Sequence, residues 1–216
     1  NHKLLDFGCG SLRAGKLFIT FLDKGTYYGQ DPNQWLIDDG LKNELGKDII
    51  DLKKTNFSNL ENFELGFTEK FDYILAQSVF SHCNKKYLKK GINSIFNGLK
   101  NDGIALITIK EGIKDYSGPN DWLYPEVTKF KRKTISKILN ENTKYWKRLY
   151  WFHPSQTWYV FTKSRSKLPS SFDNFFLLGG EEINSQHYNH QHFFRNRLRR
   201  FLFLRRLVKF IKLTMR

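Results

Sequence analysis

The stretch "LLDFGCGSLRAG", residues 4–15, decides the fold. A buried apolar strand is predicted to end at Phe7. Gly8 and Gly10 then let the backbone turn closely before a helix that is predicted to begin at Leu12. A strand, a glycine turn and a helix in this order are typical of the first unit of a doubly wound sheet, where the turn faces a nucleotide. The question is which nucleotide, if any, this turn accepts.

Apolar runs and helical patterns alternate along most of the chain. Strands are predicted at residues 2–7, 26–30, near Phe57, 71–77, 103–109, 147–152 and 157–162. Helices are predicted at residues 12–22, 33–45, 85–99 and 129–142. Such alternation indicates parallel strands joined by right-handed crossovers, whereas the last two strands, joined by "HPSQ", form an antiparallel pair at an edge. The fold class expected is therefore α/β: a doubly wound, mostly parallel seven-stranded, Rossmann-like sheet with a basic C-terminal helical extension.

Charge and composition divide the chain into three parts. We expect a domain at residues 1–163 whose N-terminal part is missing, a linker at 164–192 and a basic amphipathic tail at 193–216. Of the net charge of +15, nine positive charges fall within residues 195–216, which hold no acid, so +6 remains for the rest. An inference about anionic partners therefore concerns the tail first.

The two cysteines, Cys9 and Cys83, are far apart and match no metal-ligand spacing. This usage favours a reducing compartment, and we expect a cytoplasmic protein. The sequence has no apolar run of membrane-spanning length and no signal peptide pattern.

The acidic residues around the glycine turn narrow the choice of nucleotide. A dinucleotide fingerprint would need glycine where this chain has Arg13, which disfavours a nucleotide-dependent oxidoreductase. Asp31, at the end of the second predicted strand, is placed to accept hydrogen bonds from ribose hydroxyls. Asp6, just before the turn, suits a cofactor that carries a cationic amino group instead of a phosphate.

Together, "LDFGCG" (5–10), "YYGQDPN" (27–33) and "FDYILAQSVFSH" (71–82) resemble the class I S-adenosylmethionine-dependent methyltransferases over about residues 2–110. The resemblance implies S-adenosylmethionine as the cofactor. It implies cofactor contacts from Asp6, Gly8, Cys9, Gly10, Asp31, Gln77 and Ser78. It also implies an adenine contact somewhere within residues 59–64. Leu12 departs from the family, where a third glycine is common, and we interpret it as the first core residue of the helix, with Gly15 allowing close packing on the strand.

Methyl transfer needs an aligned acceptor and, for a hydroxyl acceptor, removal of a proton. His82, just past the fourth main strand, is the candidate base; the alternative is a structural histidine that ties its loop to the backbone. Trp122 and Tyr124 either line an acceptor pocket or form a local hydrophobic staple that stabilises their own loop. The expected acceptor is a hydroxyl or carboxyl of a small molecule, a saccharide or a lipid-linked compound. The alternative function is a catalytically inactive methyltransferase-like scaffold or membrane-surface module.

The tail at 193–216 separates apolar from basic residues at helical angles in its second half, which favours an anionic membrane surface. Docking onto a protein is the main alternative, and nucleic acid is the least favoured partner. His187, His190 and His192 form a short tract, but their spacing favours a polar linker, so no metal site is predicted.

Overall fold

The computed structural model describes residues 2–46, 48–118 and 121–169. Most of the described residues, from His2 to Leu149 and from His153 to Leu168, form one compact unit, to which Tyr150–Phe152 do not belong. The predicted tail at 193–216, most of the predicted linker and the three histidines of the tract lie outside the described residues. Within the described part of the chain, no helix is long and apolar enough to cross a membrane.

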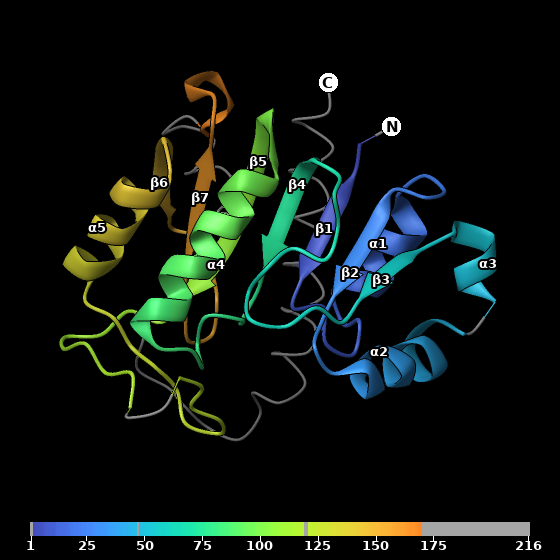
Figure 1. Ribbon diagram of the computed structural model, residues 1–216, viewed down its shortest axis with the longest axis horizontal. Helices are drawn as coiled ribbons and strands as arrows, with labels where there is room; N and C mark the ends of the chain where they lie inside the picture. Colours follow the sequence, from blue (N-terminus) through green and yellow to red (C-terminus); the bar gives the residue numbers. More distant parts are fainter. Residues whose placement is uncertain (1, 47, 119–120, 170–216) are drawn as a thin grey trace. The chain divides into compact units, whose positions relative to one another are not determined.

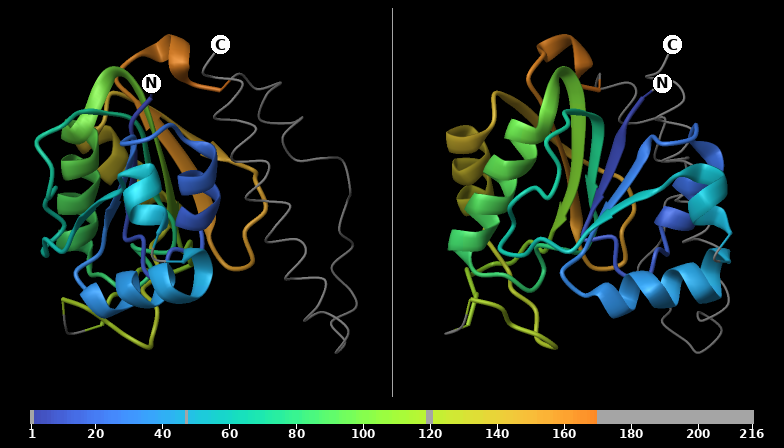
Figure 2. Two further views of the ribbon diagram at one scale, coloured as in Figure 1. Left: turned by 90° about the vertical axis from the view of Figure 1, so that its right-hand side faces the viewer. Right: turned by 45° about the vertical axis from the view of Figure 1, so that its right-hand side comes forward.

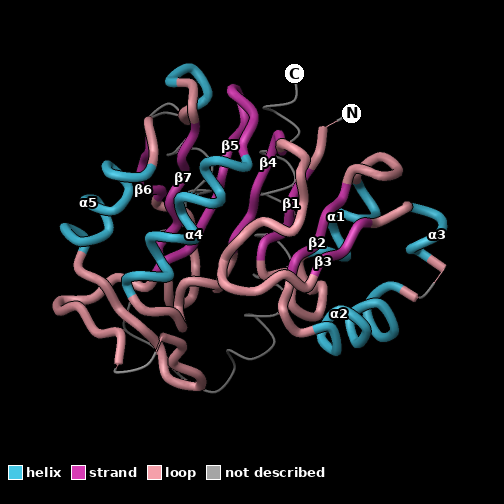
Figure 3. The backbone as a smooth tube through the Cα atoms, viewed as in Figure 1, coloured by secondary structure: helices cyan, strands magenta, loops and turns pink. Residues whose placement is uncertain are grey.

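This compact unit is built on a seven-stranded sheet with the order β3-β2-β1-β4-β5-β7-β6 (Figures 1 and 3). The strands are β1 Leu4–Phe7, β2 Tyr27–Gln30, β3 Asn56–Ser58, β4 Phe71–Ala76, β5 Leu99–Ile109, β6 Tyr145–Leu149 and β7 Thr157–Thr162. Strands β1 to β5 pair in parallel, while β7 is antiparallel to both β5 and β6. The predicted α/β class, the parallel pairing and the antiparallel pair at the edge are confirmed.

Helices cover both faces of this sheet. They are α1 Gly15–Phe21, α2 Gln34–Gly40, α3 Ile49–Lys53, α4 Lys85–Gly98 and α5 Arg132–Asn142, with a π-helical turn at Leu41–Leu45 and a 3₁₀ turn at Arg165–Lys167. Figure 2 shows α4 and α1 on opposite faces of the sheet. α4 directs Leu88, Ile92 and Ile95 at the sheet with spacings of four and three residues, as an amphipathic helix requires.

Several predicted boundaries were wrong, each for a local reason. The helix expected from Leu12 begins at Gly15, because Leu12 has a left-handed backbone with φ of 56°. Leu12 is nevertheless fully buried, as predicted. β5 begins at Leu99 and not at residue 103, so it follows α4 without a loop. The last helix begins at Arg132, since Lys129 pairs through its backbone with Tyr116.

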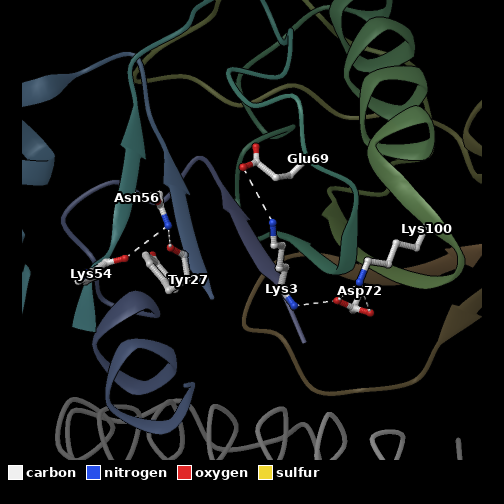
Figure 4. Close-up of polar contacts among 7 residues, drawn as sticks. All are labelled: Lys3, Tyr27, Lys54, Asn56, Glu69, Asp72 and Lys100. Atoms are coloured by element: carbon white, nitrogen blue, oxygen red, sulfur yellow. Dashed lines mark hydrogen bonds and ion pairs between the residues drawn. The ribbon is translucent and has the colours of Figure 1, made fainter. Parts of the chain in front are cut away.

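Charged groups at the amino edge of the sheet are paired with one another (Figure 4). The Asp72 carboxylate accepts the backbone N–H of Lys3 at 2.7 Å and the Lys100 ammonium at 2.8 Å. Lys3 Nζ also lies 3.9 Å from Glu69 Oε1. These contacts tie the starts of β1, β4 and β5 together.

Candidate active site

The turn after β1 is shaped by two glycines in left-handed conformation. Gly8 has φ of 75°, and a Cβ atom there would lie 2.4 Å from Val79 Cγ2, so the close approach of the segment after β4 requires glycine. Gly10 has φ of 49°, and nothing lies within 4 Å of an added Cβ. The turn therefore packs against the protein at Gly8 and borders open space at Gly10.

Asp31, at the end of β2, orders this turn. Its Oδ2 accepts the N–H of Gly10 at 3.0 Å, and its Oδ1 accepts the N–H of Asn33 at 2.9 Å. Oδ1 also accepts the side-chain amide of Asn33 at 3.2 Å, whereas Oδ2 keeps a second lone pair and can still accept a ribose hydroxyl. The sequence predicted only the ribose contact; the structure adds that Asp31 holds the glycine turn in place.

Asp6 is buried within β1, and the Tyr27 hydroxyl donates to its Oδ2 at 2.9 Å. Burial raises the pKa of Asp6 to about 7; the hydrogen bond from Tyr27 opposes this, and the charge of Asp31 adds to it. Burial also raises the pKa of the Cys9 thiol, so Cys9 is not a nucleophile. A cation placed beside Asp6 and Asp31 would relieve the repulsion between these two carboxylates.

The segment after β4 brings Gln77 and Ser78 to the same edge. Ser78 has a left-handed backbone with φ of 63°, a strained conformation for a residue other than glycine. It is held there because its N–H donates to Thr108 Oγ1 at 2.7 Å and its Oγ accepts the Gln156 amide at 3.1 Å. Gln156, which precedes β7, was not anticipated from the sequence.

His82 is bonded to the loop between β5 and α5, which is drawn in yellow-green below α4 and α5 in Figure 1. Its Nδ1 lies 2.8 Å from the carbonyl oxygen of Glu126, and its ring contacts Trp122 and Tyr124 at centroid distances of 5.6 and 5.3 Å. A carbonyl can only accept, so Nδ1 carries a proton, and in the neutral ring Nε2 keeps its lone pair. This bonding supports the structural role directly and leaves Nε2 able to act as a base.

Two unanticipated residues connect these parts. Gln30 hydrogen bonds to both the glycine turn and the loop after β3. Phe63, in that loop, packs its ring against Phe80 and Trp122, with centroid distances of 5.8 and 6.3 Å. The sequence signal for Gln30 is a polar residue in an otherwise apolar strand, directly before Asp31. Among the described residues, no group of three metal-binding side chains is found.

The match to known proteins agrees with this geometry. Residues 5–105 match the family model described as "Methyltransferase domain". This match is consistent with the predicted resemblance to the class I methyltransferase family. The match spans the glycine turn, Asp31 and the segment after β4, so it bears out the predicted resemblance over these residues.

Solved methyltransferases share the fold of this domain at low sequence identity. An S-adenosylmethionine-dependent methyltransferase from Clostridium acetobutylicum ATCC 824 is 15% identical with a TM-score of 0.55, over 75% of this chain and 84% of that one. Magnesium protoporphyrin IX methyltransferase from Synechocystis PCC 6803, with bound S-adenosylmethionine, is 14% identical with a TM-score of 0.54, over 75% and 70%. A glycopeptide N-methyltransferase complexed with S-adenosylhomocysteine is 10% identical with a TM-score of 0.56, over 74% and 82%. No curated protein sequence matches this chain significantly.

Proposed function

We propose that the protein is an S-adenosylmethionine-dependent methyltransferase. The observation that carries the proposal is the ordered turn at Gly10, whose N–H is held by Asp31 while the space in front of its Cα is open. Buried Asp6 lies beneath the same turn. A carboxylate pair beside an open glycine turn suits a ligand with ribose hydroxyls and a cationic amino acid moiety.

Each residue of the turn has a distinct task in this proposal. Asp31 accepts the ribose hydroxyls, and the turn at Gly8, Cys9 and Gly10 encloses the methionine moiety. Asp6 attracts the ammonium group. When bound, S-adenosylmethionine supplies an electrophilic methyl carbon, so the protein has to bind, orient and exclude water rather than provide a nucleophile.

His82 is the proposed base for a hydroxyl acceptor, through its Nε2. The bond from Nδ1 to the Glu126 carbonyl fixes the ring and keeps this tautomer. A carboxyl acceptor is ionised at neutral pH and needs no base. Trp122 and Tyr124, half or more exposed beside the His82 ring, offer aromatic surface to such a small-molecule, saccharide or lipid-linked acceptor.

Isothermal titration with S-adenosylhomocysteine tests the cofactor assignment without an acceptor. The full chain should bind it, and Asp31→Ala should weaken binding by about 100-fold because the ribose contacts and the order of the turn are lost together. Asp51→Asn, on the exposed side of α3, is the control and should bind normally. A full chain that fails to bind at millimolar concentration would overturn the proposal in favour of an inactive scaffold.

We assign the tail at 193–216 to an anionic membrane surface because it holds nine basic residues and no acid. A cytoplasmic protein that associates with membranes through this segment would meet a lipid-linked acceptor there. Flotation with vesicles containing phosphatidylglycerol should recover the full chain and not a chain ending at residue 192. Equal flotation of both forms would defeat this assignment.

A further inference from the structure

Gln30 is a buried polar residue that bonds to two separate loops at once. It is 3% exposed and ends β2, directly before Asp31. Its backbone carbonyl accepts the N–H groups of Gly8 at 2.7 Å and Cys9 at 3.0 Å. Its side chain reaches in the other direction, to the loop at residues 60–66 that follows β3.

The side-chain amide of Gln30 makes three hydrogen bonds in this loop. Nε2 donates to the carbonyl oxygens of Leu60 at 3.0 Å and Glu64 at 2.6 Å, while Oε1 accepts the N–H of Gly66 at 3.0 Å. These three bonds use both hydrogens and one lone pair of the amide. Glutamate would offer no hydrogen to the two carbonyls, and an apolar side chain would leave all three backbone groups without a partner.

The loop needs an anchor of this kind. Asn62 and Phe63 both have left-handed backbones with φ of 60°, a strained conformation for residues other than glycine. The three hydrogen bonds from the Gln30 side chain offset that strain. The Gln30 amide therefore holds the loop in a conformation that its own residues disfavour.

This loop lies at the same edge of the sheet as the glycine turn, because β3 and β2 are parallel and adjacent. The N–H of Asp31 donates to the Ser58 carbonyl at 3.1 Å, so the loop starts directly beside the ribose-binding carboxylate. If Asp31 holds the ribose, the base attached to that ribose reaches the backbone of residues 60–66.

We propose that Gln30 is a positioning residue that fixes the 60–66 loop and thereby sets the nucleobase selectivity of the cofactor site. The proposal rests on the proposed function. The rigid backbone of the loop presents N–H and C=O groups at fixed positions, and these groups discriminate between bases by their donors and acceptors. Adenine and hypoxanthine have nearly the same shape but opposite hydrogen-bonding groups at two ring positions, so a fixed loop rejects one of them.

The experiment compares S-adenosylhomocysteine with S-inosylhomocysteine by isothermal titration. The wild-type chain should prefer the adenine ligand by about tenfold or more. Gln30→Met keeps the length of the side chain but removes the three bonds; it should weaken adenine-ligand binding by about tenfold and bring the ratio of the two affinities close to one. The ratio is the decisive readout, because general destabilisation weakens both ligands equally.

Thr162→Val is the matched control. Thr162 is also fully buried and donates to the Gly103 carbonyl at 2.8 Å, but it lies at the end of β7, at the amino edge of the sheet. This variant loses that bond and the bond that Oγ1 accepts from the N–H of Ser164 at 3.2 Å, and it should keep the wild-type affinity ratio. A folded Gln30→Met chain with the wild-type ratio would overturn the proposal.

Hydrogen exchange separates a failure of this inference from a failure of the proposed function. In Gln30→Met, the amides of residues 60–66 should exchange at least tenfold faster, while those of β5 remain protected. Faster exchange in β5 as well, or unchanged exchange in the loop, would contradict the positioning role. This readout needs no ligand, so it stands even where the chain binds neither homocysteine derivative. Gln30→Glu should have the same loosened loop above neutral pH.

Discussion

Neutralising Asp6 should stabilise the protein while impairing its cofactor site. Burial raises the pKa of Asp6 from an ordinary value of 3.8 to about 7, with Asp31 adding to the rise. Between these two values the folded state holds the proton and the unfolded state has released it, so stability falls as the pH rises. At about 1.36 kcal/mol for each pKa unit, the full loss above pH 7 is about 4 kcal/mol.

Asp6→Asn removes the ionisation and keeps an oxygen that accepts the Tyr27 hydroxyl. Urea unfolding should show the variant to be more stable than wild type at pH 8, by up to about 4 kcal/mol. More than half of this gain should disappear between pH 8 and pH 5, because wild-type Asp6 takes up its proton over that range. Asp72→Asn is the control: this carboxylate is paired with Lys100, so its neutralisation should lower stability.

The same ionisation should control cofactor affinity. An ammonium group is attracted only to the charged form of Asp6, so S-adenosylhomocysteine should bind wild type about tenfold more weakly for each pH unit below 7. The Asp6→Asn variant should bind weakly and with little change across this range. A variant whose stability gain is the same at pH 5 and pH 8 would refute the reasoning, because the charge of Asp6 would then carry no cost in the folded state.

Further predictions concern His82 and the two glycines of the turn. His82→Asn keeps a donor for the Glu126 carbonyl but lacks Nε2. The variant should preserve stability and cofactor binding and lower turnover of a hydroxyl acceptor by about 100-fold or more. Unchanged turnover would leave His82 with the structural role alone. Gly8→Ala should lower the free energy of unfolding by about 3 kcal/mol because its Cβ meets Val79 at 2.4 Å. Gly10→Ala should cost only about 1 kcal/mol of stability but weaken S-adenosylhomocysteine binding by about tenfold or more, since its Cβ enters the open space. Urea unfolding measures the stability of both variants, and isothermal titration measures their affinity. Equal effects of Gly8→Ala and Gly10→Ala would contradict these separate roles of the two glycines.

The strands and the glycine turn could be predicted because parallel strands buried on both faces are continuous apolar runs that end at small or acidic residues. The short helix α3 and the loop at 60–66 could not, because neither has an apolar period. The loop is held instead by Gln30, about thirty residues earlier in the chain. The start of α1 differs from the prediction because Leu12 is buried in a left-handed turn, and burial alone does not distinguish such a turn from a helix.

Gly15 shows how a packing residue contributes to the chemistry of the site. It was predicted to permit close helix-to-strand packing, and an added Cβ would indeed lie 2.6 Å from the Tyr27 hydroxyl oxygen. That hydroxyl is the group that donates to Asp6, and its donation opposes the rise in the pKa of Asp6 caused by burial. Without the space left by Gly15, Tyr27 could not reach Asp6, and the carboxyl would ionise only at a higher pH. Gly15 thus affects the ionisation of Asp6 through Tyr27. The packing pattern in the sequence predicts the close helix-to-strand contact at Gly15 but not this effect on Asp6.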